Sequence, residues 1–189
     1  MKEKIKASIN ASIETQKTLI GNIKEIETVA QQLIGCLKNK GKIICFGNGG
    51  SSADAQHFAA ELVGRFKKQR KALASIALTT NTSILTAVSN DFGYEQVFSR
   101  QIEAVALEND FALGISTSGT SKNVIKALET AKQKDLKTAL LTSKAIKNKP
   151  NVCDYMISID SSDTPRIQEA HITILHILCE LIDDAFENA

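Results

Sequence analysis

The first forty residues carry apolar side chains at the spacing of amphipathic helices. From Ile5 to Leu37, isoleucine, valine and leucine recur three, four or seven positions apart among lysine, glutamate and glutamine. This spacing predicts one or two long helices with a break near Gly21 and Asn22. Long helices ahead of the first strand need a surface on which to bury their apolar stripe. We therefore expect residues 1–40 to pack on the rest of the chain and on partner subunits.

Beyond residue 40, short apolar runs alternate with helical patterns. The predicted strands cover residues 42–47, 74–79, 111–116, 138–142 and 155–159. The predicted helices cover residues 51–66, 82–89, 94–106, 121–134 and 164–187. Continuous apolar strands that alternate with helices are typical of a parallel sheet covered on both faces. The sequence thus predicts an α/β fold, a three-layer αβα sandwich, with residues 41–189 as its main unit.

Composition narrows the class of protein. The 189 residues are 43% hydrophobic and 23% charged, as in ordinary globular domains. The net charge of +2 and the absence of tryptophan give no reason to expect a nucleic-acid partner. No apolar run approaches the roughly 18 residues of a membrane span, so no membrane partner is expected. Four scattered cysteines and an N-terminus without a signal-peptide pattern predict a cytoplasmic protein.

Two serine-rich turns follow predicted strands and open predicted helices. The first, residues 47–52 (GNGGSS), has glycines that let the backbone approach a ligand, and Ser51 can cap the next helix together with Asp54. The second, residues 116–121 (STSGTS), has five hydroxyls in six residues. Hydroxyls and free N–H groups at a helix start bind phosphate without lysine or arginine. Each turn alone could be plain capping, but two at neighbouring strand ends favour a phosphate site.

The same turns do not match nucleotide-binding motifs. Thr120 stands where the Walker A pattern needs lysine, which argues against a P-loop NTPase. The first turn lacks the third glycine of GxGxxG, and no acidic residue ends the second strand, which argues against NAD binding. A charged run at residues 65–71 (RFKKQRK) is interpreted as a solvated loop rather than an anion site.

Two polar pairs lie on otherwise apolar helices. His57 and Glu61 are four residues apart and share one face of a helix. Gln168 and His176 lie roughly 80° apart around the last helix and can face one site, whereas His171 is expected to point elsewhere. The four residues of the two pairs are plausible ligands of a divalent metal such as zinc. Spacing supports this only weakly, so a surface pair and a core histidine stay open as alternatives.

Four sequence blocks resemble one known family. The blocks GNGGSSADAQHFAAEL, NDFG, GISTSGTSKNV and RIQEAHITILHIL are similar to the sugar isomerase (SIS) domain and, more closely, to the bacterial phosphoheptose isomerases. The resemblance implies a flavodoxin-like five-stranded sheet, a homotetramer with active sites at subunit interfaces, and one zinc ion per site. It implies conversion of sedoheptulose 7-phosphate to glycero-manno-heptose 7-phosphate through a cis-enediol. The product would supply heptose for lipopolysaccharide core or another surface polysaccharide.

The resemblance also assigns roles to single residues. It implies that Glu61 and His176 form the acid/base pair, and that these two bind the metal with His57 and Gln168. The substrate contacts that it implies are Asn48, Gly49, Gly50, Ser51, Glu61, Asn90, Asp91, Ser116, Thr117, Ser118, Ser121 and Gln168. Aldose–ketose isomerisation needs a base at carbon, an acid/base at the oxygens and a group that stabilises the enediolate. Pro165 stands where some relatives have aspartate, which affects local helix geometry more than the chemistry.

Other functions are weighed against this one. A non-catalytic SIS tetramer could bind a replication-initiator protein, but such relatives need no intact acid/base pair, and this chain has both Glu61 and His176. A regulatory module that senses a phosphosugar usually comes fused to a DNA-binding domain, and no helix-turn-helix pattern stands out here. Another phosphosugar isomerase is a further alternative. The sequence therefore favours an enzyme.

Overall fold

Five parallel strands form one sheet in the order β2-β1-β3-β4-β5 in the computed structural model, which describes residues 1–146 and 148–187. The strands are β1 (Ile43–Gly47), β2 (Ser75–Ala77), β3 (Phe111–Ile115), β4 (Lys137–Ser143) and β5 (Tyr155–Ile159). β1 lies between β2 and β3, so a topological switch point lies between β1 and β3. Open α/β sheets bind ligands beyond the carboxyl ends of the strands at such a point. The predicted parallel sheet is confirmed.

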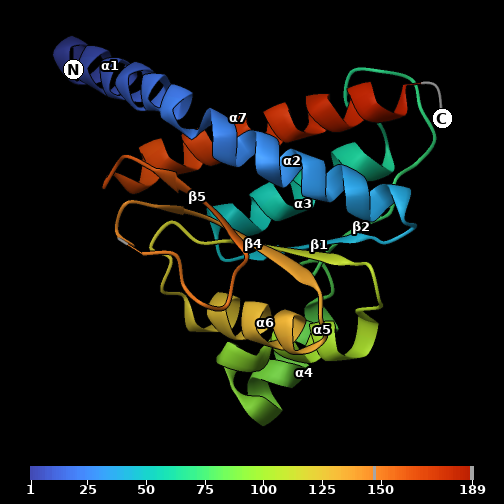
Figure 1. The fold of residues 1–189 in the computed structure, drawn as a ribbon. Helices are drawn as coiled ribbons and strands as arrows, with labels where there is room; N and C mark the ends of the chain where they lie inside the picture. Colours follow the sequence, from blue (N-terminus) through green and yellow to red (C-terminus); the bar gives the residue numbers. More distant parts are fainter. Residues whose placement is uncertain (147, 188–189) are drawn as a thin grey trace.

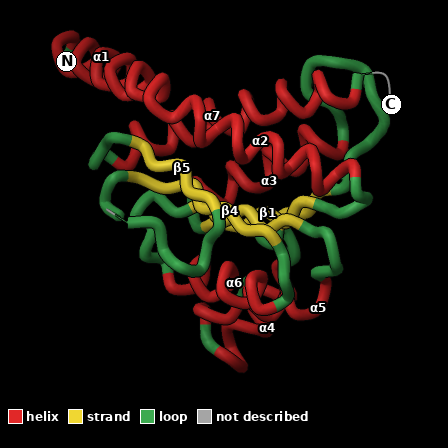
Figure 2. The backbone as a smooth tube through the Cα atoms, viewed as in Figure 1, coloured by secondary structure: helices red, strands yellow, loops and turns green. Residues whose placement is uncertain are grey.

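Helices cover both faces of the sheet. They are α1 (Lys2–Thr18), α2 (Ile23–Lys38), α3 (Gly50–Val63), α4 (Thr82–Phe92), α5 (Ser99–Val105), α6 (Lys122–Gln133) and α7 (Thr164–Phe186). Figure 1 shows α2, α3 and α7 on one side of the sheet and α4, α5 and α6 on the other. Figure 2 shows the strands as the layer between them. Alternate strand residues point to opposite faces, so Ile43 and Cys45 enter one buried cluster, and Ile44 and Phe46 enter the other.

Several boundaries differ from the sequence prediction. A short 3-10 turn at Leu19–Asn22 separates α1 from α2, which confirms the expected break. The helix expected over residues 94–106 is divided into a 3-10 turn at Tyr94–Gln96 and α5. The predicted Ser51 cap is wrong, because α3 begins at Gly50 and its N-cap is Gly49 at φ 57°, with no side-chain cap bond. A positive φ is accessible to glycine at little cost, so Gly49 can serve as the N-cap, and the helix begins one residue before the predicted Ser51.

The N-terminal helices differ in how well they are covered. α2 places Ile26, Val29 and Leu33 in the core beside α3 and α7. α1 contacts α7 but extends away from the sheet (Figure 1), and its Ile5 and Ile9 remain 54% and 55% exposed. Within residues 1–146 and 148–187, every helix is too short or too polar to cross a membrane.

Candidate active site

The two serine-rich turns meet at the carboxyl end of the sheet. β1 and β3 are neighbours, with Gly47 paired to Ile115, so the turns that follow them start side by side. A Cβ at Gly47 would lie 2.8 Å from the Ile115 carbonyl oxygen and 2.8 Å from the Ser51 Cβ. Only glycine therefore allows this close approach between strand and turn. Ser51 is buried in the first turn of α3.

Hydroxyl groups converge in the second turn. The Ser116 Oγ lies 3.0 Å from the Ser121 Oγ and 3.5 Å from the Ser118 Oγ. The Ser143 hydroxyl, at the end of β4, donates to the Thr117 carbonyl at 2.7 Å and anchors the turn. The turn leads directly into α6, whose first N–H groups attract anions. The structure thus brings the four predicted residues of this turn together at a helix start, as a phosphate site requires.

Asn48 links the two turns through a polar network. Its amide N–H donates to the Asn123 Oδ1 at 2.8 Å, and the Asn123 amide donates back to the Asn48 Oδ1 at 2.8 Å. The Tyr94 hydroxyl also donates to the Asn48 Oδ1, at 3.1 Å. An open cavity of about 510 Å³ lies here, lined by Asn48, Gly93, Tyr94, Glu95, Ser121, Lys122 and Asn123. Asn123 and Tyr94 were not among the predicted site residues, although Asn123 follows the second turn by only two residues.

Asn90 and Asp91 lie outside this cavity lining. Both are exposed in the last turn of α4, which runs past the predicted end at residue 89. The Asn90 amide donates to the Asp91 Oδ1 at 2.7 Å. Gly93, at φ 86°, follows the helix and brings the chain back to the cavity. Their predicted contact with the sugar stays a prediction.

The acid/base candidates meet between α3 and α7, which pack side by side. The His57 Nε2 lies 3.0 Å from the Glu61 Oε1 and 3.3 Å from the His176 Nε2. The Phe66 ring stacks on the His176 imidazole, with centroids 5.3 Å apart and planes at 20°. The side chains of His57 and Glu61 are 45% and 25% exposed, so the group is open to a ligand. His171 points elsewhere, as expected: it is buried, and its Nε2 lies 3.0 Å from the Thr142 carbonyl oxygen.

The donor types suit zinc, and their spacing comes close to a zinc site. Tetrahedral ligands with bonds of 2.0–2.1 Å have donor atoms about 3.3 Å apart, near the distances from the His57 Nε2 to its two neighbours. In the part of the chain that the structure describes, however, no group of three or more His, Cys, Asp or Glu side chains is placed to hold a metal ion. Gln168 lies against the first turn, where its Cδ would be 2.9 Å from a Cβ placed on Gly50. The structure therefore brings His57, Glu61 and His176 into contact, and it places Gln168 against Gly50.

Two further charged groups adjoin these helices. Burial raises the pKa of Asp54, one helical turn before His57, to about 6, while the charge of His57 opposes the shift. One Asp54 carboxylate oxygen is buried without a hydrogen-bond partner in the described chain.

The Arg70 side chain is 0% exposed and pairs with the buried Asp183 at 2.7 Å. The interpretation of residues 65–71 as a merely solvated loop is therefore wrong at Arg70.

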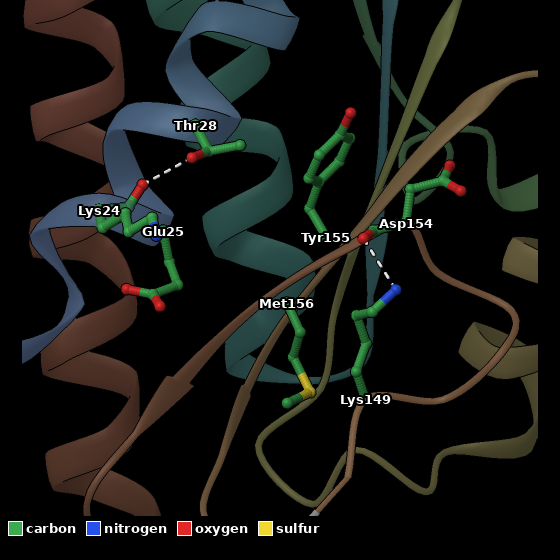
Figure 3. Close-up of a pocket in the computed structure, with 7 residues that line it drawn as sticks. All are labelled: Lys24, Glu25, Thr28, Lys149, Asp154, Tyr155 and Met156. Atoms are coloured by element: carbon green, nitrogen blue, oxygen red, sulfur yellow. Dashed lines mark hydrogen bonds between the residues drawn. The ribbon is translucent and has the colours of Figure 1, made fainter.

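A separate cavity of about 230 Å³ lies between α2 and β5 (Figure 3). Its lining residues are Lys24, Glu25, Thr28, Lys149, Asp154, Tyr155 and Met156. The Lys149 Nζ donates to the carbonyl oxygens of Cys153 and Asp154, at 2.8 and 2.9 Å. The Thr28 hydroxyl donates to the Lys24 carbonyl oxygen at 2.7 Å. These groups serve the fold, and the predicted site residues lie elsewhere.

Comparison with known proteins places the chain in a family. The family model described as the SIS domain matches residues 3–143, and the chain belongs to this family. Within it, the chain belongs with the phosphoheptose isomerases. It is 54% identical over 162 residues to phosphoheptose isomerase 1 of Campylobacter jejuni, covering 86% of this chain and 87% of the relative. It is 50% identical to phosphoheptose isomerase of Geotalea uraniireducens, covering 97% of each.

A solved structure agrees with this placement. Phosphoheptose isomerase from Neisseria gonorrhoeae superposes with a TM-score of 0.88 at 39% identity, covering 97% of this chain and 98% of that one. The match extends over the N-terminal helices as well as the sheet, because so little of either chain is left out. The predicted SIS fold is confirmed.

Proposed function

We propose that this chain converts D-sedoheptulose 7-phosphate to D-glycero-D-manno-heptose 7-phosphate. The observation that carries the proposal is the contact of Glu61, His57 and His176 across α3 and α7, in a chain that also has a hydroxyl-rich turn at the start of α6. An acid/base pair and a phosphate site are what an aldose–ketose isomerase needs. Identity near 50% to phosphoheptose isomerases supports a seven-carbon substrate. We propose that the product enters heptose synthesis for lipopolysaccharide core or another surface polysaccharide, in the cytoplasm.

The proposed mechanism assigns a task to the hydroxyl-rich turn and to each of the three residues on α3 and α7. The hydroxyls of Ser116, Ser118 and Ser121 hold the phosphate and so orient the far end of the sugar. Glu61 moves the proton between C1 and C2 through a cis-enediol. His176 exchanges protons with the oxygens on these carbons. His57, 3.0 Å from the Glu61 carboxylate, holds that carboxylate in place.

Zinc is part of the proposal. His57, Glu61 and His176 would hold the ion, and Gln168 would join them if its side chain left Gly50. A bound zinc ion would act as a Lewis acid towards the charge that develops on the sugar oxygens. A carboxylate bound to zinc is a poorer base, so Glu61 would bind loosely or alternate between its roles. The metal content of purified wild-type protein and of His57→Ala, measured by mass spectrometry, tests the ligands independently of activity.

We also propose a homotetramer with active sites at subunit interfaces. Ile5, Ile9 and Ile13 follow one face of α1 at four-residue spacing and are about half exposed. An apolar groove of about 410 Å³ lies between α2 and α7, lined by Leu19, Ile20, Ile23, Ile26, Glu27, Ile177 and Leu181. Ile177 is next to His176 in the sequence, so a chain seated in this groove would approach the acid/base pair. Light scattering should give four times the mass of one chain.

The activity test is NMR of sedoheptulose 7-phosphate incubated with the protein, with and without zinc and a chelator. We expect an aldoheptose 7-phosphate that Glu61→Gln and His176→Ala no longer form. Glu129→Gln, an exposed glutamate on α6, is the matched control and should keep wild-type turnover. Near-normal turnover in either site variant would remove that residue from the mechanism. Absence of product with every metal would favour a binding module instead.

A further inference from the structure

The loop that follows α3, residues 64–74, is fastened to both helices of the acid/base pair. The Arg70 guanidinium donates to the carbonyl oxygens of Glu61 and Leu62 at the end of α3, each at 2.9 Å. Its Nε donates to the Asp183 Oδ1 on α7 at 2.7 Å. These bonds join the carbonyl of the proposed base directly to the helix that carries His176.

Asp183 holds the start of the same loop. Its Oδ2 accepts the backbone N–H groups of Lys67 and Lys68, at 2.7 and 2.9 Å. With the bond from Arg70, its carboxylate has three donors and an exposure of only 1%. A carboxylate satisfied in this way is a rigid anchor, because moving the loop would leave a buried charge unpaired. Phe66 directly precedes the first of these two backbone donors, so its position is fixed with them.

Phe66 and His57 contact the His176 imidazole in two different ways. Phe66 stacks on the ring at 5.3 Å and 20°, whereas His57 meets it edge-on at 5.0 Å and 63°. A stacked face restricts rotation of the imidazole about its last side-chain bond. That rotation would swing the Nε2 away from His57 and from a substrate oxygen. Proton transfer depends on this alignment, and small misplacements are costly.

We propose that Phe66 is a positioning residue for His176 and that the Arg70–Asp183 pair holds Phe66 in that position. The proposal rests on the function proposed above, since it takes His176 as the acid/base. It gives the charged run at residues 65–71 a role in the reaction. Phe66 and the buried Arg70, both from this run, would fix the geometry of the acid/base groups on α3 and α7. Neither residue is assigned a contact with the substrate.

The test compares Phe66→Leu, Phe66→Tyr and Lys71→Ala in the full-length protein. Leucine keeps apolar volume but lacks the flat face, whereas tyrosine keeps the face. Lys71 is an exposed neighbour in the same loop and is the matched control. We expect Phe66→Leu to lower kcat about tenfold with KM within about twofold, because alignment is lost while phosphate binding is kept. Phe66→Tyr and Lys71→Ala should retain wild-type kcat.

A second readout does not depend on turnover. The chain has only three histidines, so the ring protons of His176 can be assigned by comparison with His176→Ala. The ring current of Phe66 should shift these signals upfield in the wild type, and Phe66→Leu should remove the shift. If leucine does not fold, Phe66→Met replaces it.

Three outcomes would overturn the proposal. The first is a folded Phe66→Leu with wild-type kcat, and the second is His176 signals that do not change in that variant. The third is a rise in KM without a fall in kcat, since it would assign Phe66 to binding. Failure of the proposed function is a different result: the wild type would form no aldoheptose while the ring-current shift remained.

Discussion

The Arg70→Ala substitution tests whether residues 65–71 are held by a buried ion pair or form an ordinary solvated loop. The side chains of Arg70 and Asp183 are 0% and 1% exposed, and alanine would leave the Asp183 carboxylate buried without its cation. The carbonyl oxygens of Glu61 and Leu62 would lose their guanidinium donors as well. Removing one partner of a buried ion pair costs about 3–5 kcal/mol. A solvated loop charge, as the sequence predicted here, would cost about 0.5 kcal/mol or less.

The assay is urea unfolding at one fixed protein concentration, because association contributes to the measured free energy. We expect Arg70→Ala to lower the free energy of unfolding by about 3–5 kcal/mol. Lys71→Ala should stay within about 0.5 kcal/mol of the wild type. A double-mutant cycle with Asp183→Ala should give a coupling energy of at least about 1 kcal/mol, since the two side chains are in contact.

The same pair gives a pH dependence with a defined sign. Burial by itself raises the pKa of Asp183, but the hydrogen bonds from the Lys68 N–H, Arg70 and the Lys67 N–H outweigh it and lower the pKa below its ordinary value. Ionised Asp183 therefore stabilises the folded chain above about pH 4, which is the pKa of this carboxyl in the unfolded chain. This stabilisation is lost as the pH falls through the lower pKa of the folded chain. Asp183→Asn should remove this acid sensitivity. An Arg70→Ala cost below about 1 kcal/mol, with coupling near zero, would refute the buried anchor.

Three further predictions test other parts of the structure. Burial lowers the pKa of His171 to about 4 despite its bond to the Thr142 carbonyl. As the pH falls, the unfolded chain therefore takes up the His171 proton first, and the free energy of unfolding decreases between about pH 6.5 and 4. In His171→Gln, the urea midpoint should change less with pH over this range. Gly119→Ala should raise KM and lower the free energy of unfolding by more than about 1 kcal/mol. The reason is that Gly119 has a φ of 66° and that a Cβ there would lie 2.7 Å from the Thr142 Oγ1. Gly21→Ala is the control and should do neither, because a Cβ at Gly21 would have no atom within 4 Å. A thiol reagent should label no cysteine in the native protein and four in denaturant, because burial raises the thiol pKa values of Cys36, Cys45, Cys153 and Cys179.

Much of the site could be predicted because its signals are local. The apolar runs and their helical partners predict a parallel sheet, and the two serine-rich turns follow strands that are neighbours in it. His57 and Glu61 are four residues apart, so the helix alone brings them together. Both turns and this pair lie on the elements that the sequence predicts for them. The sequence blocks that contain them also indicated the family.

Other features depended on contacts between distant segments. Asn123 lies 75 residues from Asn48, and Asp183 lies 113 residues from Arg70, so no spacing or periodicity marks either pair. The position of Gln168 against Gly50 depends on how α7 packs on α3. The charged run 65–71 resembles any solvated loop until the fold provides a carboxylate to bury Arg70. The sequence by itself determined the elements and the local chemistry, because these follow from neighbouring residues. Only the tertiary structure decided which polar side chains are buried together, because burial depends on what the rest of the chain places around them.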